Sequence, residues 1–273
     1  MSVPFPSIPP VVLVFAASDP TGGAGLQADV MSLAALGVHA ASALTGVTVQ
    51  DSAGVYEVVP LPGDLVERQA RVLLADIPVA AFKLGVLAST AAVHAVARVL
   101  AAYPQLPVVF DPVLASGRGD AFAGAELIAA MRAHILPLTW LATPNSIEAR
   151  RLACLSENAG LDAAAAELCA AGARNVLVTG THEAGAEVVN SLHGENGARR
   201  FAWPRLAGEF HGSGCTLAAA CAGWLARGAS MQEAVERAQQ FTWAALAGAH
   251  ALGRAQRIPD RSYALRQRDG GNV

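Results

Sequence analysis

The chain has 273 residues, of which 53% are hydrophobic and 15% charged, and its formal net charge is −3. This length can bury the core of one α/β domain. The scattered arginines form no basic stripe, so nucleic-acid binding lacks an electrostatic basis. The only lysine, Lys83, excludes a Walker A loop, which requires Gly-Lys-Ser/Thr.

Cysteines and apolar runs predict the cellular location. None of the four cysteines (Cys154, Cys169, Cys215, Cys221) shows C-x-x-C or zinc spacing, which suits reduced thiols in a reducing compartment. The Pro-rich start lacks the features of a secretion signal, and no apolar run reaches the roughly 18 residues of a membrane span. We expect a cytoplasmic protein with no membrane partner. We also expect an N-terminal arm (1–10), one domain (11–260) and a polar C-terminal tail (261–273).

The first predicted element is a buried strand at residues 11–17, a continuous run of apolar and β-branched residues. A glycine-rich loop follows (18–25), then a helix (26–36) that Gly37 ends. Residues 23–28 match the G-x-G-x-x-A dinucleotide fingerprint by letter. Five residues separate the strand from this match, and no acid ends the second strand, so the context argues against a dinucleotide site.

The middle of the chain alternates between predicted strands and helices. Runs 39–49 and 55–59 flank a turn at 50–54, which predicts a hairpin-like excursion placed to cover a substrate. Further helices are predicted at 65–75, 90–102 and 123–134 and from Ser146 on, and further strands at 80–84, 108–111 and 140–142. This order predicts a mostly parallel sheet with helices on both faces and ligands at the carboxyl ends of its strands.

Two acids near these strand ends are candidate metal ligands. Asp111 ends one apolar strand, and Glu148 lies three residues after Asn145, where a helix follows the next strand. Magnesium is typically held by one or two carboxylates together with water and substrate phosphates. Alternatively, Asn145 is a helix N-cap and Glu148 completes a capping box, and the local sequence favours this structural role.

The later chain predicts a helix (161–171), a strand (175–179) and an antiparallel pair (187–192 and 199–203) that closes one edge of the sheet. A long helix at 231–252 is expected to pack on the helix before it.

The segment with the clearest chemical signal is HGSGCT at residues 211–216, which leads into an Ala/Leu-rich helix (217–225). Amides at a helix start have no intrahelical partner, and two glycines let the loop approach an anion. The same field favours a thiolate, so we expect a lowered pKa for Cys215. Alternatively, Cys215 only packs in the core. His211 is interpreted as a loop hydrogen-bonder, not a base.

Two of these segments resemble the signatures of one family. Residues 18–29 (SDPTGGAGLQAD) and 211–216 are similar to motifs of the ribokinase-like kinases, and within them of the hydroxymethylpyrimidine/phosphomethylpyrimidine kinases of thiamine biosynthesis. The resemblance spans roughly residues 11–260. It implies a three-layer α/β sandwich whose mostly parallel central sheet has a short antiparallel edge. It also implies ATP and Mg²⁺ as cofactors, and we expect a homodimer.

The implied reaction is phosphorylation of 4-amino-5-hydroxymethyl-2-methylpyrimidine and then of its monophosphate. Cys215 takes the place of the catalytic base, and Gly212, Ser213 and Gly214 cradle the transferring phosphoryl group. The positions matching the pyrimidine contacts are Gln50, Asp29, Ala24 and Val113; those near the metal and the phosphates are Asp111 and Glu148; the nucleotide contacts are Thr179 and Asn145.

The chain departs from the family pattern at three positions. Thr179 stands where a lysine is frequent, so a cation that contacts phosphate is missing or replaced. Val86 stands in place of a methionine and Ala17 in place of a glycine. The nearest alternative is a pyridoxal kinase of the same fold, a second is a catalytically silent pyrimidine-binding domain, and a nicotinamide-dependent oxidoreductase is a distant third.

Overall fold

The computed structural model describes residues 8–114, 124–195 and 197–269. The first seven residues of the expected arm, the first residue of the predicted helix 123–134 and the end of the expected tail lie outside these ranges. The strands are β1 (Val11–Ser18), β2 (His39–Asp51), β3 (Gly54–Pro60), β4 (Ala81–Leu84), β5 (Val108–Phe110), β6 (Leu141–Ala142), β7 (Asn175–Val178), β8 (Glu187–Gly194) and β9 (Gly197–Pro204).

The helices fall between these strands and after them, which confirms the predicted alternation. They are α1 (Gly25–Ala35), α2 (Gly63–Asp76), α3 (Thr90–Leu100), α4 (Ala125–His134), α5 (Ser146–Leu152), α6 (Leu161–Ala170), α7 (Ser213–Ala226), α8 (Met231–Ala247) and α9 (Tyr263–Asp269), with a 3-10 turn at Leu136–Leu138.

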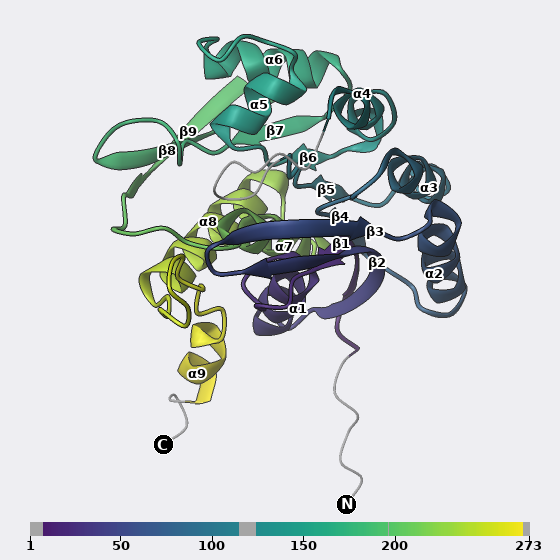
Figure 1. Cartoon of the computed structure of the whole chain (residues 1–273), viewed down its shortest axis with the longest axis horizontal. Helices are drawn as coiled ribbons and strands as arrows, with labels where there is room; N and C mark the ends of the chain where they lie inside the picture. Colours follow the sequence, from purple (N-terminus) through teal and green to yellow (C-terminus); the bar gives the residue numbers. More distant parts are fainter. Residues whose placement is uncertain (1–7, 115–123, 196, 270–273) are drawn as a thin grey trace, which may run out of the picture.

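One nine-stranded sheet runs through the molecule in the order β3-β2-β1-β4-β5-β6-β7-β8-β9. The six strands from β2 to β7 in this order are parallel, whereas β3 and the β8–β9 pair run antiparallel to their neighbours at the two edges. The sequence predicted the β8–β9 edge as antiparallel. The sequence analysis placed residues 55–59 in a hairpin-like excursion, whereas in the structure they belong to β3, which forms the opposite edge of the sheet (Figure 1).

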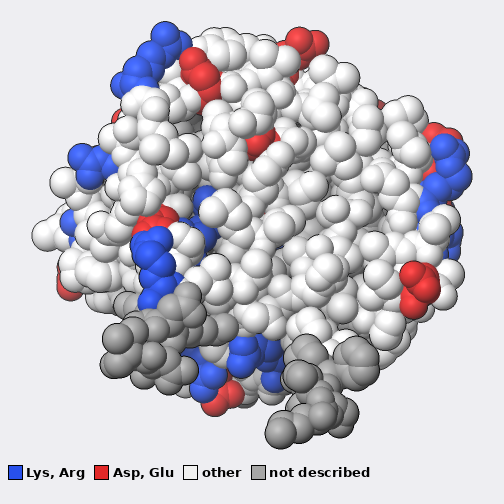
Figure 2. Space-filling model, turned by 90° about the horizontal axis from the view of Figure 1, so that it is seen from below, with Lys and Arg blue, Asp and Glu red and all other residues white. Residues whose placement is uncertain are grey.

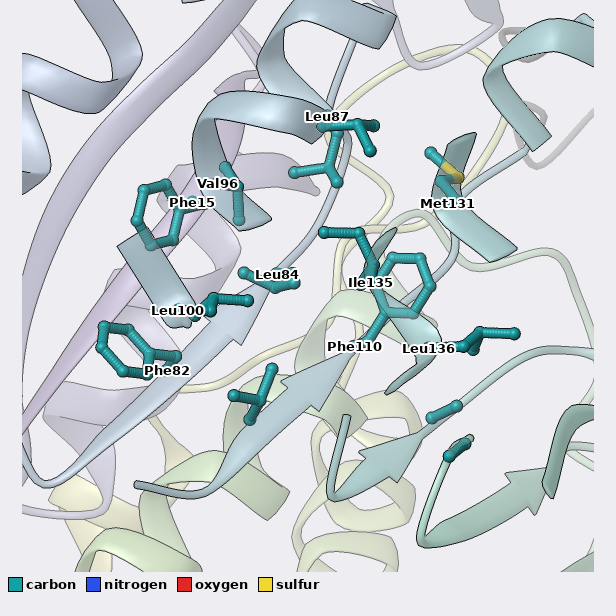
Figure 3. Close-up of a cluster of buried hydrophobic side chains, with 14 of the residues drawn as sticks. Phe15, Phe82, Leu84, Leu87, Val96, Leu100, Phe110, Met131, Ile135 and Leu136 are labelled. Carbon is teal, nitrogen blue, oxygen red and sulfur yellow. The ribbon is translucent and has the colours of Figure 1, made fainter. Parts of the chain in front are cut away.

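Helices cover both faces of the sheet, because alternate residues of its buried strands point to opposite sides. Leu13 and Phe15 of β1 face the cluster beneath α2 to α6, whereas Val12 and Val14 face α1, α7 and α8. Figure 3 shows the first cluster, in which Phe15 and Phe82 lie beside Leu84 and Leu100. The three-layer sandwich implied by the family resemblance is therefore confirmed.

One prediction near the C-terminus is wrong. The helix predicted at 231–252 ends at Ala247, since Gly248 caps it and His250 pairs with Ile258. The segment expected to be a polar tail is partly folded: α9 forms within it, and Arg261 is fully buried.

Charged groups are sparse on the face seen in Figure 2, where several small groups contain both basic and acidic side chains and a broad area is uncharged. This agrees with the absence of a basic stripe in the sequence. Within the described ranges, no helix has both the length and the apolar character needed to cross a membrane.

Candidate active site

A cavity of about 690 Å³ lies at the carboxyl ends of the parallel strands. It extends from the β2–β3 hairpin to β8 and β9, so its two ends are formed by opposite halves of the sheet. Of the residues that the sequence predicted for the site, all but Asp29 line it: Ala24, Gln50, Asp111, Val113, Asn145, Glu148, Thr179, Gly212, Ser213, Gly214 and Cys215. Strand ends and helix starts thus bring together residues that are far apart in sequence.

The loop between β1 and α1, residues 18–24, is organised by its own aspartate. Asp19 accepts hydrogen bonds from the amides of Thr21 (2.8 Å) and Ala24 (2.7 Å) and from the Thr21 hydroxyl (2.9 Å). His211 places its Nε2 2.8 Å from the same carboxylate. Burial alone would raise the pKa of Asp19, but the bonds to His211 and Thr21 outweigh it and lower the pKa to about 2. This loop, the acceptor loop, is therefore held around a carboxylate.

A second loop, residues 211–214 at the start of α7, packs directly against the acceptor loop. A Cβ on Gly212 would lie 2.0 Å from the carbonyl oxygen of Gly23, and a Cβ on Gly23 would lie 2.4 Å from the His211 ring. Gly212 also has a φ of 75°, in the left-handed region that favours glycine. The glycines of the two signatures thus permit this close contact. We call residues 211–214 the anion loop, because they include the first amides of α7, which have no side-chain cap.

Cys215 sits in the first turn of α7 and lines the cavity, with 9% of its surface exposed. Its thiol donates a hydrogen bond to the Asp111 carboxylate, and the Gly25 amide at the start of α1 donates to its sulfur. Both interactions place the thiol where two helix N-termini and a strand end converge.

The prediction of a lowered pKa for Cys215 is wrong. Burial raises the pKa of this thiol to about 12; Lys83 opposes the rise, while Asp111 and Asp29 add to it. A helix N-terminus does favour a thiolate, but the sequence does not reveal that this thiol is buried and that two carboxylates lie close to it. In this state Cys215 is a neutral thiol hydrogen-bonded to Asp111.

Asp29 does not line the cavity, so the structure does not place it as a pyrimidine contact. Its side chain is 0% exposed and its Oδ2 lies 2.9 Å from the Nζ of Lys83, which is also fully buried. Burial raises the pKa of Asp29 to about 6, although Lys83 opposes this rise. Asp29 therefore neutralises a cation behind the site instead of facing a ligand.

Asp111 and Glu148 both line the cavity, but their carboxylate oxygens differ in the hydrogen bonds that they accept. The Glu148 oxygens accept from the amides of Asn145 (3.0 Å) and Leu114 (3.3 Å), and the predicted capping box with Asn145 is confirmed. Asp111 Oδ2, in contrast, is buried and has no partner among the described residues. Burial, followed by the nearby Asp111 charge, raises the pKa of Glu148 to about 8. An orphaned carboxylate oxygen next to a second acid fits a divalent cation.

The other end of the cavity holds Thr179, the residue that replaces a frequent lysine. The arginine that lines this end, Arg205, donates to the carbonyl oxygens of Thr181 (2.8 Å), Glu183 (2.7 Å) and Gly185 (2.8 Å). Its guanidinium thus shapes the turn after β7 and does not directly replace the lysine.

Sequence reasoning missed two residues that build the site, Asp19 and Arg261, and it missed the contact that His211 makes with Asp19. His211 is a loop hydrogen-bonder, as interpreted, but it also lines the cavity and contacts Asp19. An Asp followed two residues later by Thr is a turn signal that could have indicated the role of Asp19. No local signal indicates that Arg261 is buried, because its partners lie far away in sequence.

The comparisons with known proteins agree with this geometry. A family model described as phosphomethylpyrimidine kinase matches residues 19–259. A hydroxymethylpyrimidine/phosphomethylpyrimidine kinase of Streptomyces coelicolor is 39% identical over 269 residues, which cover 97% of this chain and 99% of that protein.

Two solved structures are similar as well. A pyridoxal kinase of Bacillus subtilis, solved as an ADP complex, gives a TM-score of 0.86 at 29% identity and covers 95% of this chain and 100% of its own. A phosphomethylpyrimidine kinase of Clostridium difficile gives 0.75 at 29% identity and covers 86% and 98%. Because the family model and the Streptomyces relative both extend over most of the sequence, this chain belongs to the phosphomethylpyrimidine kinase family.

Proposed function

We propose that this protein, a phosphotransferase by its family, uses ATP to phosphorylate 4-amino-5-hydroxymethyl-2-methylpyrimidine and then its monophosphate, as a step of thiamine biosynthesis. The observation that carries the proposal is the convergence of Cys215, Asp111 and the start of α7 on one cavity that also contains Gln50. Family membership supports the substrate, and the ADP bound to the Bacillus pyridoxal kinase supports the nucleotide.

The two ends of the cavity fit the two substrates. The pyrimidine end is bounded by the acceptor loop and the hairpin, where Gln50 offers an amide donor and acceptor and Ala24 and Val113 offer apolar contacts. The nucleotide end is bounded by Asn145, Thr179 and the β8–β9 pair. The anion loop lies between them, so the γ-phosphate and the hydroxymethyl group meet at α7.

In the proposed step, the hydroxymethyl oxygen forms a bond to the γ-phosphorus of ATP, and the bond from this phosphorus to the bridging oxygen breaks. ADP leaves with the electron pair. The hydroxyl proton passes to the sulfur of Cys215 as the thiol's own proton moves to the Asp111 carboxylate, with which it already shares a hydrogen bond. The amides of Ser213 and Gly214 in the first turn of α7 stabilise the charge on the transferring group.

Asp111 and Glu148 are the residues that would hold Mg²⁺ together with the nucleotide phosphates, and the ion would supply positive charge to the phosphoryl oxygens. Within the described ranges, no three His, Cys, Asp or Glu side chains are grouped to hold a metal by themselves. This fits an ion that is held jointly by the protein and the nucleotide.

Product analysis by mass spectrometry tests the proposal directly. The protein is incubated with ATP, Mg²⁺ and an equimolar mixture of the pyrimidine alcohol and pyridoxal. We expect the pyrimidine monophosphate first and the diphosphate later. Preferential formation of pyridoxal phosphate would instead support the second candidate, a pyridoxal kinase, which the similarity to the Bacillus enzyme favours. Binding of the pyrimidine without any consumption of ATP would establish a silent binding domain.

The homodimer and the cytoplasmic location remain predictions. Light scattering after size-exclusion chromatography checks the first, and fractionation of cells that express the tagged protein checks the second.

A further inference from the structure

Arg261 is buried at the junction of the two loops that form the centre of the site. It follows the segment 256–260, and 0% of its side chain is exposed. Removing a guanidinium from water is costly unless its donors find partners. The contacts of the side chain must therefore explain how its buried charge is stabilised.

Arg261 contacts both loops at once. Its Nη2 donates to the carbonyl oxygen of Gly23 in the acceptor loop at 2.5 Å and to that of Gly212 in the anion loop at 3.4 Å. Its Nε donates to the hydroxyl of Thr216 at 2.9 Å, and this hydroxyl donates to Gly212 at 2.8 Å. One planar side chain thus joins the acceptor loop to the first turn of α7.

The backbone around Arg261 is itself anchored, so the side chain is presented from a fixed point. The Gln256 amide donates to Ser52 at the tip of the hairpin (3.0 Å), and the Asp260 amide donates to Ala245 of α8 (2.9 Å). The Arg257 amide donates to Glu209, just before the anion loop (2.9 Å). The segment before Arg261 therefore connects the hairpin, α8 and the anion loop.

The charge of Arg261 is not neutralised by a direct ion pair with any described carboxylate. Three acidic side chains lie close enough to interact with it through space, namely Cys215, Asp29 and Asp19. A guanidinium stays protonated at all pH values at which proteins are folded. Its positive charge therefore adds to that of the α7 N-terminus, behind the position where a phosphoryl group would lie.

We propose that Arg261 is a positioning residue for phosphoryl transfer: its guanidinium holds the anion loop against the acceptor loop, so that hydroxyl and γ-phosphate meet in line. The kinetic part of this proposal rests on the proposed kinase function. The structural part, that Arg261 couples the two loops, does not. A misplacement of about 1 Å in such an arrangement can lower turnover on the order of 100-fold.

Hydrogen–deuterium exchange tests the coupling without reference to any substrate. The variants are Arg261→Ala and, as matched control, Arg266→Ala, which removes a largely exposed arginine that pairs with Asp260 nearby. We expect Arg261→Ala to increase exchange in peptides covering residues 18–27 and 209–217 and to leave the strands unchanged. Arg266→Ala should leave both loops protected. An increase across the whole chain, or in neither loop, would overturn the coupling.

Kinetics test the positioning role. We expect Arg261→Ala to lower kcat about 100-fold while the KM values for ATP and for the alcohol change less than about threefold. Added guanidinium should restore part of the lost kcat in this variant and none in Cys215→Ala. If Arg261→Ala does not fold, Arg261→Lys, which keeps the charge and loses the planar fork, takes its place; it should show a loss of kcat without guanidinium rescue, because the lysine fills the space. A loss confined to KM in either variant, or no rescue of a folded Arg261→Ala, would overturn the role.

The two proposals fail in distinguishable ways. If the wild-type protein phosphorylates none of the alcohols, the proposed function fails, while the exchange experiment still decides whether Arg261 couples the loops. If the wild type is active and Arg261→Ala retains full kcat, only the positioning role fails.

Discussion

The acceptor loop and the anion loop are both glycine-rich turns between a strand and a helix, but they use their amides differently. The acceptor loop satisfies its amides internally, because Asp19 accepts from Thr21 and Ala24. The anion loop has no side-chain cap at the start of α7, and it is held from outside by Asp19, which contacts its His211, and by Arg261. A loop supported from outside keeps its own donors available for an anion.

The largest expected effect concerns the cysteine at the start of α7. Replacing Cys215 with Ala should lower kcat by roughly 10²- to 10⁴-fold, the range for loss of a group that takes part in proton transfer. The melting temperature should change little, since the exchange removes one atom at the cavity wall. Steady-state kinetics and circular dichroism measure both. Full activity in a folded Cys215→Ala variant would assign the proton to Asp111 alone.

The next effect concerns α1, the helix that follows the acceptor loop. Replacing Asp29 with Asn leaves Lys83 as an unpaired buried cation, which should destabilise the protein by about 3–5 kcal/mol. Urea unfolding measures this change. A stable Asp29→Asn protein whose KM for the pyrimidine rises sharply would show that Asp29 does contact the substrate, contrary to its position in the structure.

A third prediction addresses the contact between the loops. Gly212 and Gly22 both have positive φ angles, of 75° and 71°, but only a Cβ on Gly212 meets another group. Gly22→Ala should lower the free energy of unfolding by about 1–2 kcal/mol, because alanine is strained at this φ. Gly212→Ala should cost a further 1–3 kcal/mol, roughly the range for overpacking, because its Cβ collides with Gly23. Equal losses in urea unfolding would mean that the loops separate without cost.

The smallest effect concerns pH and the carboxylate that organises the acceptor loop. The pKa of Asp19 is lowered from 3.8 to about 2 in the folded state, so the unfolded chain binds a proton first as pH falls. Its contribution, on the order of 2 kcal/mol, is present above the unfolded value and is lost as pH falls through about 2. Urea unfolding at pH 5 and pH 3 should therefore show a smaller decrease for Asp19→Asn than for wild type.

The sequence predicted the helices and strands, and all but one of its candidate site residues line the cavity, because these features depend on local patterns. The apolar run of β1, the glycines of both loops and the Asn145–Glu148 capping box are each readable within a few residues. The direction in which nearby charges and burial shift the pKa values could not be predicted from the sequence. Asp29 meets Lys83 across 54 positions, and Arg261 meets Gly23 across 238. Burial, together with partners at such separations in the sequence, raises the pKa of Cys215 and folds part of the segment that was expected to be a tail.

Lys83 has a practical consequence of its own. It is the only lysine in the chain, and its ammonium group is fully enclosed beside Asp29. Selective isotope labelling of lysine would therefore give one side-chain resonance, with no surface amines to overlap it. Because Cys215 and Asp111 also act on the Lys83 charge, that single resonance would report nucleotide binding from inside the protein, in solution and in real time.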